Sequence, residues 1–270
     1  MRRKNVNLKW VISRFDVDLK KEAGVVELSN VYIGTSGYSY EHWRGDFYPA
    51  TLSPKEYLPF YAQHFNTVEI NYSFYHIPAE KSVQNWKNQV PAPFLFTLKA
   101  NRQITHRAKL NHVEGLTRVM TWRMHLLGEK AGVLLFQLPP SLSKDLVRLE
   151  KFLQILPSQI RCAFEFRNPS WFDEETLTLL QQYQAAFCIV SAPDFPLLIR
   201  ATAPFVYFRF HGQKQWIHYS YSEQELHFWA EKMAAFHRQG KEVFAYFNND
   251  PEANAVRNAQ RLKEILRDLQ

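Results

Sequence analysis

The stretch CAFEFRNPSWF at residues 162–172 joins the apolar run of a buried β-strand to two charged side chains at the point where the strand ends. Side chains on a strand alternate between its two faces. Phe164 and Phe166 therefore share one face, whereas Glu165 and Arg167 share the other. A strand with one apolar face and a charged carboxyl end suits a barrel, in which one face meets the helices and the other leads to the active site.

Seven other short apolar runs resemble this one, and longer amphipathic segments lie between most of them. The expected strands are VYIGTS 31–36, TVEI 67–70, FLFTLK 94–99, GVLLFQ 132–137, CAFEF 162–166, AFCIV 186–190, FVYFRF 205–210 and EVFAYF 242–247. The clearest helical patterns cover residues 53–65, 114–128, 222–240 and 251–269. In the last two of these segments apolar residues recur at three- and four-residue spacing, which predicts amphipathic helices.

Eight strands alternating with helices predict an α/β fold of the (β/α)₈ TIM-barrel type, which commonly takes about 250 residues. An open doubly wound sheet is the alternative, and it usually carries a glycine-rich phosphate turn after its first strand. The segment GTSGYS 34–39 lacks that spacing and is followed by aromatic residues. We therefore expect one barrel domain at 31–270, preceded by a basic N-terminal extension at 1–30. The link at 191–204 has the weakest helical pattern.

The composition is that of an ordinary globular protein, with 46% hydrophobic and 22% charged residues in 270. The two cysteines, Cys162 and Cys188, lie in apolar runs, which suits a reducing compartment better than a disulfide framework. No apolar run has the length of a membrane span. The N-terminal segment begins with basic residues, but Ser13 and Arg14 interrupt its apolar part, which argues against a signal peptide. These features predict a cytoplasmic protein without a membrane partner.

The formal net charge of +7 raises the question of nucleic-acid binding. Residues 1–30 hold seven Lys and Arg against four Asp and Glu, a net +3, so that residues 31–270 carry about +4. A charge of this size is ordinary for a chain of that length and indicates nucleic acid only weakly.

Five expected strands end in polar or charged residues on the face predicted to point inward: Glu69, Lys99, Gln137, Glu165 and Arg209. Catalytic residues of TIM barrels come from several strand ends at this one end of the barrel. Buried charges persist when they are paired, so we expect Glu69 to pair with Lys99 and Glu165 with Arg167 or Arg209. The alternative is an ion network that closes the barrel without binding a ligand.

The residue types at these strand ends suggest particular roles. Glu69 and Glu165 could transfer protons, with His211 as a further proton carrier, whereas Lys99 and Arg209 could hold an anion. The aromatic side chains of Trp43, Tyr72, Trp171 and Trp216 follow expected strands, where they could stack on a sugar or a base. No cofactor motif is present, and Glu69, Glu165 and His211 support a metal site only weakly because they do not form a ligand motif.

Several segments also resemble a known family. They are GTSGYSYEHWRGDFYP 34–49, NTVEINYSFYHIP 66–78, FTLKANRQITH 96–106, LLFQLPPSL 134–142, FEFRNPSW 164–171, YFRFHG 207–212 and YFNNDPEANAVRNAQRL 246–262. In this order they are similar to the YecE-like family, a widespread group of unknown function, across most of residues 31–270. The resemblance implies a TIM barrel. The family motifs coincide with Ser36, Glu69, Lys99, Gln137, Glu165, Arg209, His211 and Asn248, Asn249 and Asp250.

Three functions remain open from the sequence. The first is an enzyme acting on a small anionic ligand, such as a phosphosugar or a nucleotide, held by Lys99, Arg167 and Arg209. The second is a nucleic-acid binder that uses the basic extension and the aromatic residues. The family barrel has been likened to apurinic endonucleases, but their metal-ligand set is not visible here. The third is a non-catalytic binding protein whose charges pair internally.

Overall fold

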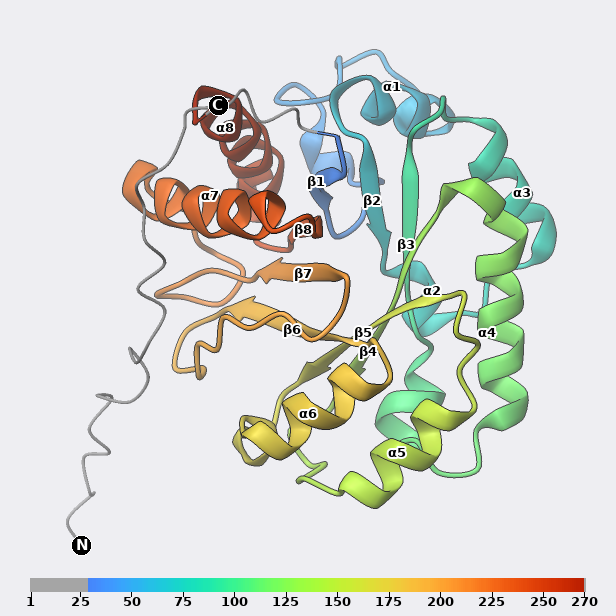
Figure 1. The fold of residues 1–270 in the computed structure, drawn as a ribbon. Helices are drawn as coiled ribbons and strands as arrows, with labels where there is room; N and C mark the ends of the chain where they lie inside the picture. Colours follow the sequence, from blue (N-terminus) through green and yellow to red (C-terminus); the bar gives the residue numbers. More distant parts are fainter. Residues whose placement is uncertain (1–28, 270) are drawn as a thin grey trace, which may run out of the picture.

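Eight parallel strands with helices around them make up residues 29–269, the part of the chain described by the computed structural model (Figure 1). The sheet order is β1-β8-β7-β6-β5-β4-β3-β2. The strands are β1 (Val31–Thr35), β2 (Thr67–Ile70), β3 (Leu95–Lys99), β4 (Ala131–Leu138), β5 (Arg161–Phe166), β6 (Ala186–Ser191), β7 (Phe205–Phe210) and β8 (Glu242–Phe247). Each lies within one or two residues of the range expected from the sequence.

The first and last strands of this order, β1 and β2, meet at their carboxyl ends. Ser36 and Glu69 form a parallel bridge, and the Gly37 N–H donates to the Glu69 carbonyl oxygen at 2.7 Å. The Tyr61 hydroxyl also joins the two strands, since it accepts from Thr35 N at 2.8 Å and donates to Thr67 O at 3.1 Å. The sheet is therefore a nearly closed barrel, which confirms the predicted α/β class.

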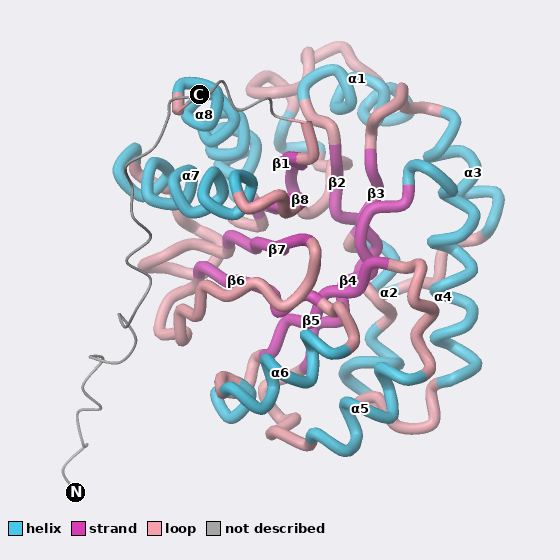
Figure 2. Tube along the Cα trace, viewed as in Figure 1, coloured by secondary structure: helices cyan, strands magenta, loops and turns pink. Residues whose placement is uncertain are grey.

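The helices surround the strands, as Figure 2 shows. They are α1 (Tyr57–His64), α2 (Tyr72–Tyr75), α3 (Glu80–Asn88), α4 (Glu114–Leu127), α5 (Leu146–Gln154), α6 (Glu174–Gln182), α7 (Glu223–Arg238) and α8 (Asn254–Asp268). The segment 191–204 holds no helix, in keeping with its weak pattern. A π-helical turn, Gln103–Arg107, follows β3. Within residues 29–269, none of the helices combines the length and the apolarity needed to cross a membrane.

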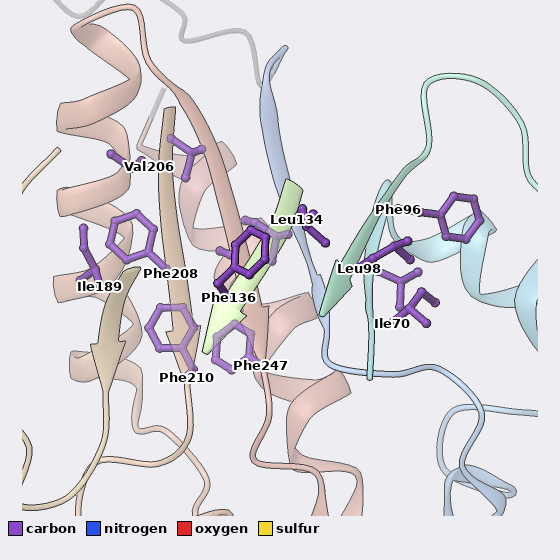
Figure 3. Packing of buried hydrophobic residues seen from close by; sticks show 14 of the residues in the cluster. Ile70, Phe96, Leu98, Leu134, Phe136, Ile189, Val206, Phe208, Phe210 and Phe247 are labelled. Carbon is purple, nitrogen blue, oxygen red and sulfur yellow. The ribbon is translucent and has the colours of Figure 1, made fainter. Parts of the chain in front are cut away.

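Two apolar layers hold the barrel together. The larger one lies between strands and helices, and Figure 3 shows part of it, including Phe96, Leu134, Phe136, Phe208 and Phe247. A continuous outer layer of this kind requires every strand to turn one apolar face outward. The alternation predicted from the sequence is confirmed.

The inner layer changes from apolar to charged along the barrel axis. Toward the amino ends of the strands, Leu95, Phe205 and Phe244 fill the interior. One level higher, the Tyr246 hydroxyl lies 2.7 Å from Thr67 Oγ1 and 2.8 Å from Thr97 Oγ1. The carboxyl ends of the strands carry the charged residues. A polar site inside the barrel is therefore expected at that end.

Candidate functional site

Arg209, at the end of β7, lies between two carboxylates that come from two other strands, β2 and β5. Its Nη2 donates to Glu69 Oε1 at 2.7 Å, and its Nη1 donates to Glu165 Oε2 at 2.5 Å. All three side chains are buried, with 1% or less of the residue exposed. One guanidinium therefore pairs with a carboxylate from each of β2 and β5, and buried carboxylates require such partners.

The remaining carboxylate oxygens are also engaged by neighbouring side chains. Glu69 accepts from the Ser36 hydroxyl and from the Tyr207 hydroxyl, each at 2.6 Å. On Glu165, Oε1 accepts from Gln137 Nε2 at 2.8 Å and contacts Arg167 Nε as an ion pair. We call Glu69, Lys99, Gln137, Glu165, Arg167, Arg209 and His211 the mouth cluster.

These contacts keep both carboxyl groups ionised. Burial alone would raise the pKa of Glu69, but the charges of Arg209 and Lys99 and the hydroxyls that donate to it hold that pKa below its usual value. Burial acts in the same direction on Glu165, where Arg167 and Arg209 hold the pKa well below the usual range. Carboxylates of this kind are not proton donors at neutral pH.

His211, which follows β7, is a neutral part of the same cluster. Burial and the charge of Arg209 lower the pKa of His211 to about 4, although Glu165 acts in the opposite direction. Arg167 Nη2 lies 2.8 Å from His211 Nε2, and the Asn248 side-chain amide lies 3.0 Å from Nδ1. Because a guanidinium can only donate, Nε2 accepts the hydrogen bond from Arg167.

Lys99, at the end of β3, differs from the other charged members. Its ammonium makes no hydrogen bond or ion pair with any residue between 29 and 269; it lies 4.4 Å from the centre of the Phe74 ring. Burial and the neighbouring Arg209 lower the pKa of Lys99 to about 8, against the opposing effect of Glu165 and Glu69. The expected Glu69–Lys99 pair is therefore wrong, because Arg209 takes the position beside Glu69.

His106 and Phe74 also belong to this region, and the sequence reasoning assigned no role to either. The rings of Phe74 and His106 are perpendicular, with centres 5.0 Å apart. Burial and the charge of Lys99 lower the pKa of His106. Phe74 follows Glu69 by five residues and His106 follows Lys99 by seven, and both lie in segments that resemble the family, which are the signals that the sequence offered. The π-helical turn after β3 positions His106, and such turns are frequent at functional sites.

The aromatic residues expected to stack on a ligand occupy different environments. Trp216 is 42% exposed and lies 4.9 Å from the Arg167 guanidinium, and Tyr72 is 54% exposed after β2. Trp43 is buried, with its indole N–H bonded to Asp250 at 2.7 Å. Trp171 is also buried, since it packs on Phe166 in the outer layer, and its indole N–H donates to Leu142 O. We therefore remove Trp171 from the ligand-binding residues.

Asn248, Asn249 and Asp250 divide between the site and its support. Asn248 contacts His211 within the site, as described above. Asn249 is buried and donates to Tyr219 O at 2.7 Å and to Asn258 Oδ1 at 2.8 Å, which ties the end of β8 to α8. Asp250 bonds Trp43 and lies 3.0 Å from His42 Nε2. We reassign Asn249 and Asp250 to the loops that support the site.

Neither a metal cluster nor a reactive thiol is found here in the part of the chain that the structure describes. No group of three or more His, Cys, Asp or Glu side chains between residues 29 and 269 is arranged to hold a metal ion. Cys162 lies in the outer layer and Cys188 inside the barrel, both as free thiols. Burial raises the pKa of Cys162 to about 12 and that of Cys188 well above its usual value.

Two cavities lie at the other end of the barrel, near the amino ends of the strands. One, of about 280 Å³, is lined by residues that include His64, Lys263 and Arg267. The other, of about 350 Å³, lies beside α4 and includes Trp122 and Arg161. Both are distant in the fold from the mouth cluster, so the charges and not the size of a cavity distinguish the candidate site.

Comparison with known proteins places this barrel in a family. A family model described as "Protein of unknown function DUF72" matches residues 32–270. The chain belongs to the DUF72 family. The UPF0759 protein YunF of Bacillus subtilis is 28% identical over 271 residues, which cover 87% of this chain and 94% of YunF. The UPF0759 protein YecE of Escherichia coli is 32% identical over 152 residues, about half of each chain. The predicted YecE-like family is confirmed.

Solved DUF72 structures share the fold. A DUF72 family protein from Thermotoga maritima is 31% identical, with a TM-score of 0.80 over 87% of this chain and 98% of that one. A DUF72 family protein from Enterococcus faecalis is 24% identical, with a TM-score of 0.77. All the residues of the mouth cluster lie inside the DUF72 match, so the candidate site belongs to the part of the chain that is shared with the family.

Proposed function

We propose that this DUF72 protein is an enzyme that binds a small anionic ligand, bearing a phosphate or a carboxylate, at the carboxyl end of its barrel. The charge balance of the mouth cluster carries the proposal. Lys99, Arg167 and Arg209 supply three cations, whereas Glu69 and Glu165 supply two carboxylates. With His211 neutral, one positive charge remains uncompensated.

That excess charge resides on the member of the cluster that is free to meet a ligand. Lys99 is half-buried and has no ion pair in the described part of the chain, whereas the oxygens of both carboxylates are already occupied. A partly desolvated cation attracts an anion more strongly than an exposed one does, because solvent screens it less.

Within this proposal, Lys99 replaces the two glutamates as the proton-transferring group. Its pKa of about 8 lies near neutral pH, where acid–base catalysis is most effective. Glu69 and Glu165, whose pKa values are lowered, hold Arg209 and Arg167 in position instead. This differs from the roles that the residue types alone suggested.

Thermal melting tests the proposal with inorganic phosphate, phosphosugars, nucleotides and short oligonucleotides at two salt concentrations. A ligand bound only by the native protein raises its melting temperature with ligand concentration. We expect one of the small anions to stabilise the native chain and not Lys99→Met. The control is Lys263→Met, since Lys263 is also half-buried with a pKa lowered to about 8 but lies at the opposite end of the barrel.

Two results would contradict the proposal. Unchanged stabilisation of Lys99→Met would show that the anion binds elsewhere. Stabilisation by oligonucleotides alone, and only at low salt, would favour the nucleic-acid function, because phosphate neutralisation makes such binding salt-dependent.

A further inference from the structure

The amine of Lys99 has a chemical capacity beyond binding an anion, and this inference rests on the function proposed above. The pairing of the mouth cluster leaves Lys99 without a carboxylate partner. Glu69 is bound by Ser36, Tyr207 and Arg209, and Glu165 by Gln137, Arg167 and Arg209. A lysine that serves only to balance charge would be expected to contact one of these oxygens.

The surroundings of Lys99 favour its neutral, nucleophilic form. The centre of the Phe74 ring lies 4.4 Å from the Lys99 nitrogen and by itself favours the ammonium, but burial and the charge of Arg209 oppose protonation and prevail. Desolvation beside another cation is a known means of activating lysine as a nucleophile toward carbonyl compounds.

We infer that Lys99 forms an imine with the aldehyde or ketone carbonyl of a small oxo compound that also carries a phosphate or a carboxylate. The lone pair of the neutral amine attacks the carbonyl carbon, and a proton moves from nitrogen to oxygen to give a carbinolamine. The carbon–oxygen bond then breaks with uptake of one proton, which yields a protonated imine and water. The sum is ammonium plus carbonyl to iminium plus water, and no oxidant or reductant is consumed.

His106 is placed to carry the proton that this sequence releases and takes up again. It packs edge-on against Phe74, the ring that Lys99 also contacts. It is half-buried and bonded to Thr105 Oγ1 at 3.0 Å through Nδ1, which leaves Nε2 available. The half-buried Arg167, which directly follows β5, two strands away from β3, is the second cation available to the anionic group of the same ligand.

Reductive trapping tests the inference on the full-length protein. Dihydroxyacetone phosphate, glyceraldehyde 3-phosphate and pyruvate are each incubated with the protein and sodium cyanoborohydride, with and without excess inorganic phosphate. Intact mass gives the number of adducts, and peptide mapping gives their positions. We expect one adduct on Lys99 for at least one of the three compounds, its loss in Lys99→Arg, and suppression by phosphate.

Lys263 is the internal control in the same protein molecule. It shares the lowered pKa of about 8 and the half-buried position, but its ammonium donates to the His64 carbonyl at the other end of the barrel. If amine reactivity alone governed the labelling, Lys99 and Lys263 would react equally. Equal labelling, or labelling spread over the surface lysines, would overturn the inference.

The two proposals fail in different ways. Absence of an adduct with all three compounds, while small anions still stabilise the native chain and not Lys99→Met, would overturn imine formation and leave anion binding in place. Absence of both the adduct and the stabilisation would overturn both proposals.

Discussion

Arg209 connects two buried carboxylates, Glu69 and Glu165, that lie 96 residues apart in the chain. Removing one partner of a buried ion pair leaves an uncompensated charge, which typically costs about 3–5 kcal/mol. We therefore expect Arg209→Met to lower the free energy of unfolding by about that amount, measured by urea denaturation at pH 7. Arg161→Met is the matched control, because Arg161 binds Glu242 through two hydrogen bonds but is partly exposed, and its loss should cost about 0–1 kcal/mol.

The same variant should change the pH dependence of stability. In the native protein the pKa values of Glu69 and Glu165 are lowered on folding, so their contribution is present above the carboxyl range of the unfolded chain and is lost as the pH falls through the folded values. Without Arg209, burial raises these pKa values, so the variant loses stability as the pH rises. Denaturation between pH 4 and 7 should show the difference between the two proteins growing with pH; a constant difference would contradict this electrostatic account.

Replacing Lys99 should change the free energy of unfolding in the opposite direction to replacing Arg209. The folded Lys99 pKa of about 8 lies below the unfolded value, so its penalty for folding is full below pH 8 and is relieved as the pH rises toward 10.5. Lys99→Met should therefore raise the free energy of unfolding at pH 7 by roughly 1–3 kcal/mol, with a smaller gain at pH 10. Equilibrium unfolding at both pH values measures this change. A loss of stability at pH 7 would show that Lys99 has a structural role.

At the scale of elements, the seam between β1 and β2 leaves no room for a side chain at Gly34. A β-carbon on Gly34 would collide with the Thr67 carbonyl oxygen and lie 2.8 Å from the Tyr61 hydroxyl that holds the two strands together. Backbone atoms cannot move aside as a flexible side chain can. We expect Gly34→Ala to lower the free energy of unfolding by about 2 kcal/mol or more, within the range for overpacked cores.

Gly115 provides the control for that substitution. It lies in the first turn of α4, and a β-carbon there would meet nothing within 4 Å. Gly115→Ala should be neutral or stabilise by up to about 1 kcal/mol, because alanine favours the helix. Thermal melting of both variants makes the comparison, and equal loss at the two positions would mean that the seam has no special role.

At the scale of the whole molecule, the separation of a barrel domain from an N-terminal extension stays a prediction, since most of the extension lies outside the described residues. A barrel of some 240 residues buries enough surface to fold alone. We expect a chain that begins at Ser29 to melt in one transition within a few degrees of the full chain and to keep its response to small anions. A large fall in melting temperature would show that residues 1–28 belong to the folded unit.

The strands and the inward direction of the charged side chains were predictable because both depend on local alternation. Glu165 lies between Phe164 and Phe166, which both pack in the outer layer. Because side chains alternate along a strand, Glu165 must point into the barrel. The segment 191–204 was correctly expected to be the weakest in helix. The ion-pair partners of these charges were less predictable, since sequence spacing cannot tell whether Arg209 or Lys99 forms the ion pair with Glu69. Trp171, Asn249 and Asp250 follow strands as ligand-binding residues do, yet each bonds to a neighbouring loop or helix.

The sequence by itself determined the barrel, its family and the set of charges that meet at one end. Alternation and strand count suffice for the barrel and the charges, because each is a local property repeated along the chain, whereas the family follows from the resemblance of the motifs. Only the tertiary structure decided which charges pair with each other, and therefore that Lys99 lies beside Phe74 without an ion pair among residues 29–269. The physical reason is that pairing and desolvation depend on distances between strands that lie far apart in sequence, and these distances exist only once the barrel has closed.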